Sequence, residues 1–130
     1  MNTTRLLALI YEHLATFELP EPWSVRVTPQ HSYGEAPVVV QLRGVLLPGV
    51  ASDLLAWADT LTDVSAEAWR VPGGYSVHLS IRGRLADGTT VTVFDGVDQN
   101  VRFGLEPDEK RPVSLAVLRE WAALDEGVAA

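Results

Sequence analysis

The sequence predicts an α+β fold, in which a single, mostly antiparallel sheet of five or six strands carries three helices packed mainly on one face. Apolar and polar residues alternate with a period of two in several short segments, which is the pattern of strands that bury one face. Most of these segments are joined by turns too short for parallel crossovers. Three other segments carry apolar residues at helical spacing. The expected order of elements is α-β-β-α-β-β-β-α, within one domain that covers residues 1–130.

The N-terminal third predicts one helix followed by two strands. Apolar residues at helical spacing indicate a helix from Thr3 or Thr4 to residue 17, with a threonine cap and with His13 on its polar side. Strands are expected at residues 23–28 and 38–43. The loop between them, residues 29–37, is long for a hairpin, and loops of this kind often carry function.

A second helix is predicted at residues 50–61, where Val50, Leu54 and Trp57 belong to one apolar stripe. Pro48 and Gly49 introduce this helix. Because the helix lies in the connection that follows the second strand, one pairing in the sheet can be parallel.

The centre of the chain predicts a meander of three strands at residues 64–71, 75–84 and 89–94. Asp87-Gly88, flanked by alternating residues, is a strong hairpin signal because glycine accepts the positive φ of a tight turn. In the middle strand, apolar odd-numbered residues alternate with polar even-numbered residues. We therefore expect Tyr75 and the following odd-numbered side chains to face the helices, and His78 and its even-numbered neighbours to face outward.

Beyond the meander, Asp95-Gly96 is expected to turn the chain. Alternating apolar residues at positions 101, 103 and 105 predict a short sixth strand, and residues 106–112 form a charged loop. A third helix should begin at Pro112 or Ser114 and end at Gly127.

Composition excludes several classes of protein. The 130 residues contain no cysteine, so disulfides, thiolate metal sites and cysteine nucleophiles are absent. No apolar run approaches the length of a membrane span, and no secretory leader is evident, so we expect a cytoplasmic protein. The net charge of −7 makes the protein acidic and argues against binding to nucleic acid through its phosphates.

The sequence contains no motif that indicates catalysis, a metal or a cofactor. Glycine-rich phosphate loops, zinc-binding helix motifs and nucleophile elbows are all missing. His13, His31 and His78 fall on a helix, a loop and a strand, and their spacing does not require a shared metal. A non-enzymatic role is therefore favoured, with no cofactor and no metal.

The outward face of the meander is the most informative candidate site, because it combines aromatic and basic side chains. Its predicted binding residues are Trp69, His78, Arg82, Arg84, Phe94 and Arg43. Three interpretations compete: a face that is simply solvated, a surface that binds another protein or a second copy in a homodimer, and a platform on which single-stranded nucleic acid stacks.

The preferred hypothesis is a small adaptor that binds a protein, or itself, through this outer face. The alternative is an enzyme or small-ligand-binding protein with a pocket near residues 29–37, whose polar groups would be His31, Tyr33 and Glu35. A further alternative is a single-stranded nucleic-acid binder or an acidic mimic of nucleic acid. A deep pocket that brings the loop residues close to His13 or His78 would favour the ligand-binding alternative.

Overall fold

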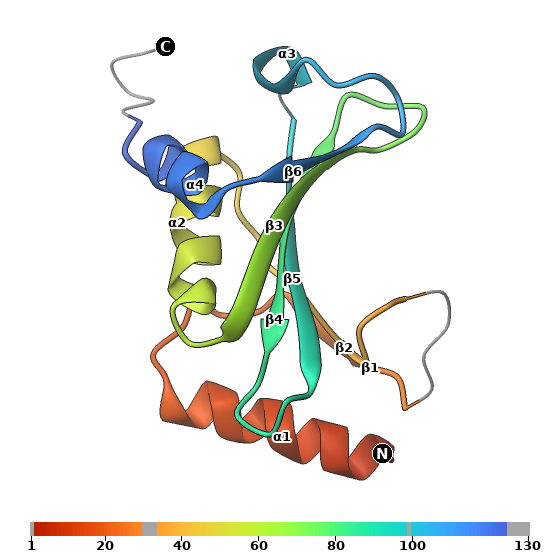
Figure 1. The fold of residues 1–130 in the computed structure, drawn as a ribbon, viewed down its shortest axis with the longest axis vertical. Helices are drawn as coiled ribbons and strands as arrows, with labels where there is room; N and C mark the ends of the chain where they lie inside the picture. The colour runs from red at the N-terminus through yellow and green to blue at the C-terminus, as the bar shows by residue number, and fades with distance from the viewer. Residues whose placement is uncertain (1, 30–33, 99, 125–130) are drawn as a thin grey trace.

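The computed structural model describes residues 2–29, 34–98 and 100–124, and these residues adopt an α+β fold (Figure 1). Within them, one sheet contains six strands: β1 (Ser24–Val27), β2 (Val38–Gln41), β3 (Thr62–Arg70), β4 (Val77–Arg84), β5 (Thr90–Val97) and β6 (Lys110–Val113). The longer helices are α1 (Thr3–Thr16), α2 (Leu47–Ala58) and α4 (Leu115–Ala122), and α3 (Asn100–Phe103) is a single helical turn. The predicted fold class is confirmed.

The strands lie in the order β1-β2-β5-β4-β3-β6, and every neighbouring pair is antiparallel except β2 with β5. After β2 the chain passes through α2 and the β3-β4-β5 meander, and β5 returns beside β2 in the same direction. The sheet is therefore mostly antiparallel with one parallel pairing, as expected. The partner of β2 is β5 and not β3, the next strand in the chain.

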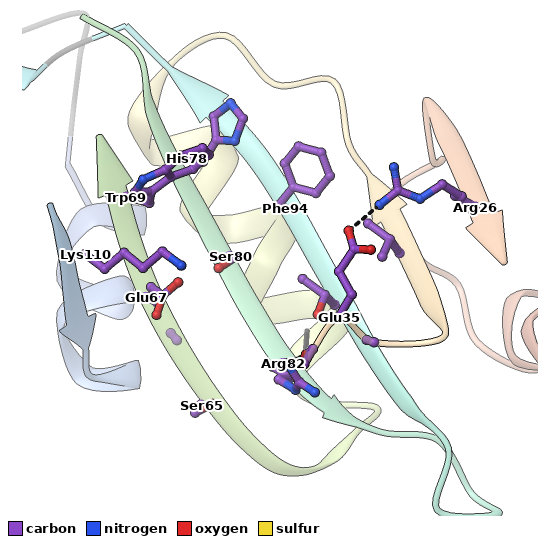
Figure 2. Close-up of a pocket in the computed structure, with 15 residues that line it drawn as sticks. Arg26, Glu35, Ser65, Glu67, Trp69, His78, Ser80, Arg82, Phe94 and Lys110 are labelled. Carbon is purple, nitrogen blue, oxygen red and sulfur yellow. Dashed lines mark hydrogen bonds and ion pairs between the residues drawn. The ribbon is translucent and has the colours of Figure 1, made fainter. Parts of the chain in front are cut away.

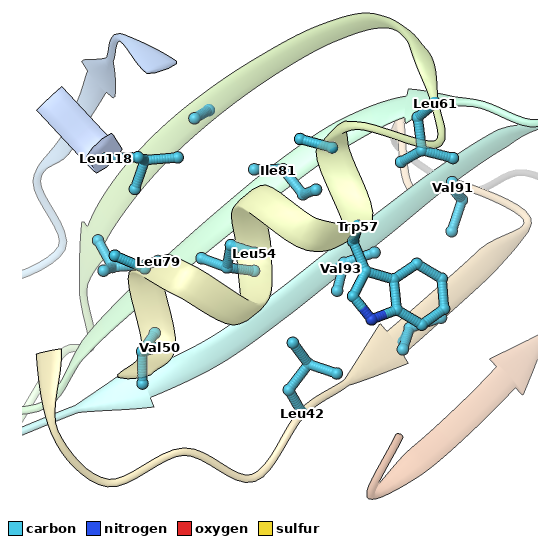
Figure 3. Packing of buried hydrophobic residues seen from close by; sticks show 14 of the residues in the cluster. Leu42, Val50, Leu54, Trp57, Leu61, Leu79, Ile81, Val91, Val93 and Leu118 are labelled. Atoms are coloured by element: carbon cyan, nitrogen blue, oxygen red, sulfur yellow. The ribbon is translucent and has the colours of Figure 1, made fainter. Parts of the chain in front are cut away.

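Helix α2 supplies the centre of the hydrophobic core. Figure 3 shows Leu54 and Trp57 projecting from α2 among side chains of β4 and β5, and both residues are completely buried. Ile81 and Val93 lie in this core and are also completely buried. Complete burial of one such side chain stabilises the fold by about 1.5–3 kcal/mol. Helices α2 and α4 thus cover one face of the sheet, and they leave the opposite face uncovered (Figure 1).

Helix α1 crosses one end of the sheet and differs from its prediction in two respects (Figure 1). Its cap is Asn2 and not a threonine, because the Asn2 side chain accepts a hydrogen bond from the Arg5 backbone N–H at 2.8 Å. His13 is buried and not solvated, with Nε2 2.8 Å from Thr60 Oγ1. Since the Thr60 hydroxyl donates to the Trp57 carbonyl at 2.7 Å, it accepts from His13, which places the imidazole proton on Nε2.

The end of the meander also differs from its prediction. Asp95 and Gly96 do not turn the chain but lie inside β5, where they pair with Leu79 and His78. The alternation of β5 continues through them, and Asp95 takes an inward position with 4% of its surface exposed.

The sixth strand exists, but at a different place. Residues 100–103 form the turn α3, and β6 begins inside the segment 106–112 that was expected to be a charged loop. Strand β6 pairs antiparallel with β3 at the sheet edge, with Trp69 opposite Lys110. Its residues are mostly exposed, so backbone pairing and not an apolar face defines it.

In β4 the predicted alternation is confirmed for Val77, Leu79 and Ile81, which are all buried. Tyr75 is an exception, because 75% of its surface is exposed. The Val71 N–H donates to the Ser76 carbonyl at 3.0 Å and closes the β3–β4 connection, so Tyr75 belongs to the turn. In the described part of the chain, no helix has the length and apolar character needed to cross a bilayer.

Candidate functional site

A groove lies on the outer face of the sheet, with a volume of about 540 Å³ (Figure 2). Its floor comes from β4 and β5, one wall comes from β3 and β6, and the other comes from β1 and residues 34–36. Volumes of roughly 300–1,000 Å³ are typical of ligand sites in proteins. The face that the alternation in the meander predicted to point outward is therefore concave.

The floor follows from strand register. His78, Ser80 and Arg82 alternate outward on β4, and the β4–β5 pairing sets Ser80 beside Phe94 and Arg82 beside Thr92. Successive outward positions on one strand lie about 7 Å apart, so the polar and aromatic groups form ordered rows. The inward side chains of the same two strands belong to the buried core.

An aromatic row crosses one end of the groove. The His78 and Phe94 rings are stacked with centroids 5.3 Å apart, and the Trp69 ring meets His78 edge to face at 5.4 Å. The Trp69 indole N–H donates to Asp108 Oδ1 at 2.9 Å, which fixes the orientation of the ring. All three aromatic side chains are partly exposed, so they present ring surface to the groove.

The wall formed by β1 and residues 34–36 is held by two arginines. Arg26 forms an ion pair with Glu35, with 2.8 Å between Nη2 and Oε1. Arg82 donates a hydrogen bond from Nη1 to the Gly34 carbonyl, also at 2.8 Å. Both contacts join the segment that follows β1 to the sheet face, so this segment forms a side of the groove.

The opposite wall carries Glu67 on β3 and Lys110 on β6. Lys110 is the only lysine of the chain, and Figure 2 shows its side chain directed over β3 toward Ser80. Together with Arg26 and Arg82 it gives the groove three cations against the carboxylates of Glu35 and Glu67. In a chain with a net charge of −7, this local excess of positive charge is notable.

His78 is the titratable group at the centre of the aromatic row. Burial lowers the pKa of its imidazole below the ordinary value, and the negative charge of Asp95 opposes part of this effect. At neutral pH the ring is therefore uncharged, and it offers a flat stacking surface.

Asp95 lies beneath the floor, on the core side of β5. It accepts hydrogen bonds from the Gly44 N–H at 2.6 Å and from the Gly96 N–H at 2.8 Å. Burial raises the pKa of Asp95 and outweighs these two hydrogen bonds. Burial and the charge of Asp95 also raise the pKa of Asp53 on α2. Through its hydrogen bond with Gly44, the Asp95 carboxylate connects β5 to the segment before α2. The position in a turn that was expected for Asp95 did not suggest this role.

The structure brings together four of the six residues predicted for the sheet face: Trp69, His78, Arg82 and Phe94. The other two lie outside the groove. Arg84 is 3.5 Å from Asp63 and donates to the Gly88 carbonyl, and Arg43 lies after β2 with its guanidinium 4.5 Å from the centre of the Trp23 ring. The binding role of all six residues stays a prediction.

Of the three residues predicted for the alternative pocket, Glu35 lines the groove on the sheet face. His31 and Tyr33 lie outside the described residues, so the alternative pocket stays a prediction. Sequence reasoning did not find Lys110, because the strand that presents it has no alternation and was expected to be a loop.

The two described histidines are not neighbours, since His13 lies in the core beside α2 and His78 lies in the groove. Among residues 2–29, 34–98 and 100–124, no group of three or more His, Asp or Glu side chains is arranged to hold a metal ion. The groove is lined by aromatic rings, hydroxyl groups and cationic side chains. Aromatic linings with a few polar groups are typical of binding sites in proteins.

No protein-family model, curated protein or solved structure matches this chain. The geometry of the groove is thus what supports a function.

Proposed function

We propose that this protein is a non-enzymatic interaction module that holds another protein against the outer face of its sheet. The observation that carries the proposal is the aromatic row of Trp69, His78 and Phe94 on adjacent strands. Aromatic and arginine side chains dominate the energetics of protein interfaces. Because these rings are held by the sheet and by one another, little side-chain entropy is lost when a partner covers them.

The ring contacts of His78 support a binding role. Its imidazole stacks on Phe94 and meets the edge of Trp69, with ring centroids 5.3 Å and 5.4 Å away. The imidazole therefore has the surroundings of a stacking partner.

The partner is either a second copy of the chain or a different protein, and solution mass separates the two. Light scattering at several concentrations reports a homodimer directly. If the protein is monomeric, its partner should be sought in a cell extract.

The decisive experiment measures the affinity of an identified and purified partner for three forms of the protein. Trp69→Ala removes a groove ring and should weaken binding by about tenfold or more. Tyr11→Ala is the matched control, because Tyr11 is an exposed aromatic residue of α1, with 70% of its surface accessible. Equal affinities for the three forms would refute the proposal.

A second candidate is a small-ligand-binding protein, and one observation favours it. Gly34 and Glu35 are joined to Arg82 and Arg26, so the segment after β1 encloses one side of the groove, as the walls of ligand pockets do. Native mass spectrometry of the purified protein distinguishes this candidate, because a bound small molecule adds a discrete mass that Trp69→Ala removes.

A further inference from the structure

Two cations of the groove lack a carboxylate partner among the described residues. Arg26 is paired with Glu35, and outside the groove Arg84 and Arg111 are paired with Asp63 and Glu109. Arg82, in contrast, donates to a carbonyl oxygen, which carries no formal charge. Within the described ranges Lys110 forms no ion pair, and Glu67 on the neighbouring strand forms none with it.

These two cations flank a common point on the floor. Arg82 and Ser80 are successive outward residues of β4, and Figure 2 shows the Lys110 side chain reaching from the other side toward Ser80. An anionic group above Ser80 would lie between a guanidinium and an ammonium group and could accept a hydrogen bond from the hydroxyl. Hydrogen bonds of this charge-assisted kind are among the strongest in proteins.

The apolar surface begins directly beside this point. Ser80 pairs with Phe94, whose ring stacks on His78. His78 in turn contacts the edge of the Trp69 ring, so the three rings form one apolar surface. A ligand that fills the groove therefore meets cations at one end and flat rings at the other. The volume of about 540 Å³ also exceeds what a single side chain fills, so it suits several consecutive residues of a partner.

We infer that the groove binds an acidic segment of a partner protein that carries an aromatic anchor. The anchor ring packs on Phe94 and His78, and a carboxylate of the segment binds Lys110 and Arg82. Charge complementarity supports this occupant, because Lys110 and Arg82, which form no ion pair with another described residue, both line the groove. The inference rests on the proposed function and specifies the chemistry of the partner.

The test uses a defined probe, the peptide acetyl-Glu-Glu-Phe-Glu-Glu-amide, titrated into the full chain by calorimetry and by amide NMR. We expect shifts at the outward residues of β4 and β5 and about tenfold weaker binding by the matched peptide with glutamine in place of glutamate. Lys110→Glu should lower the affinity for the acidic peptide by about tenfold or more. Arg119→Glu, an identical charge change at an exposed position of α4, should leave the affinity within about twofold.

Four outcomes would overturn the inference. These are equal binding of the two peptides, equal effects of Lys110→Glu and Arg119→Glu, peptide shifts outside the groove, and tighter binding of adenosine monophosphate than of the peptide at the same residues. If the peptide does not bind while Trp69→Ala still lowers the affinity for an identified protein partner, the inference of an acidic segment is wrong and the proposed function stands. If Trp69→Ala has no effect on any purified partner either, both are wrong.

Discussion

The imidazole of His78 stacks on the phenyl ring of Phe94, with 5.3 Å between the ring centroids and 28° between the ring planes. The two residues lie on neighbouring strands, and Phe94 is opposite Ser80, so the contact runs diagonally across the pairing. This contact makes Phe94 a part of the environment that controls the protonation of His78.

Removal of the Phe94 ring should raise the pKa of His78. Burial is the main cause that lowers this pKa, and Phe94→Ala exposes one face of the imidazole to water. NMR titration of the histidine ring signals measures the change, with His78→Gln to assign the resonance. Thr90→Ala, an outward substitution farther along β5, should leave the titration midpoint where it is. An unchanged midpoint in Phe94→Ala would contradict the role given to the stack.

His13 and His78 should lower the stability as the pH falls from neutral into the acidic range, whereas the raised pKa values of Asp53 and Asp95 act in the opposite direction. Burial lowers the pKa of both His13 and His78 in the folded state, so the unfolded chain binds more protons in that range. Their contribution is present above the ordinary histidine pKa and is lost as the pH falls toward the folded values. Urea unfolding at pH 7 and pH 5 measures this slope.

His13→Gln tests how much the buried His13 imidazole contributes to the dependence of stability on pH. The substitution disturbs the hydrogen bond to Thr60 and should cost about 1–3 kcal/mol at pH 7. It should also make stability less dependent on pH, because a titrating group is removed. His78→Gln is the comparison, and it should retain the part of the slope that His13 causes. A slope unaffected by either change would be inconsistent with the assignment.

Asp53→Asn should stabilise the protein at neutral pH, by less than about 1 kcal/mol. Burial and the nearby charge of Asp95 raise the pKa of Asp53, so its ionised form is disfavoured in the fold. The stability that its protonated form contributes is present at low pH and is lost as the pH rises through the folded pKa. The gain from asparagine should therefore shrink between pH 7 and pH 4, as followed by urea unfolding. Glu12→Gln, an exposed change on α1, provides the baseline.

Two glycines near the start of α2 should respond to alanine in opposite directions. A Cβ at Gly44 would lie 2.5 Å from Val50 Cγ2 and 2.6 Å from Asp95 Oδ2, so Gly44→Ala should destabilise the fold by about 1–3 kcal/mol. At Gly49, inside α2, no atom apart from its chain neighbours and the backbone of its own helix lies within 4 Å of the added Cβ, and Gly49→Ala should stabilise the fold by about 0.5–1 kcal/mol. Thermal unfolding of the two variants side by side gives the comparison. Similar effects of the two substitutions on stability would contradict the close packing of Gly44 against Val50 and Asp95.

Local alternation predicted the parts of the fold that depend on local pattern. Val77, Leu79 and Ile81 face the core, whereas His78, Ser80 and Arg82 face outward. Side chains alternate between the two faces of a strand, so a strand that buries one face must place them in this way. His78 and Arg82 reach the groove by this rule, whereas Trp69 and Phe94 also depend on the pairing of β4 with its two neighbours. Tyr75 escapes it because a turn, which has no fixed period, continues to Ser76.

Features that depend on distant partners were not predictable in the same way. Strand β6 exists because β3 offers it an unpaired edge, and its own residues carry no signal of burial. His13 looks polar in the helix pattern, yet Thr60, far along the chain, satisfies its ring nitrogen inside the protein. Asp95 shows that the alternation of β5 was stronger than the turn propensity of an Asp-Gly pair.

The position of Lys110 also determines how this protein can be handled in the laboratory. It provides the only side-chain amine of the chain, so amine-reactive esters can react with one side chain, on the wall of the groove. Coupling the protein to a sensor chip by that chemistry would block the surface whose ligands are sought. A dye attached there under mild conditions would instead report on the groove from within.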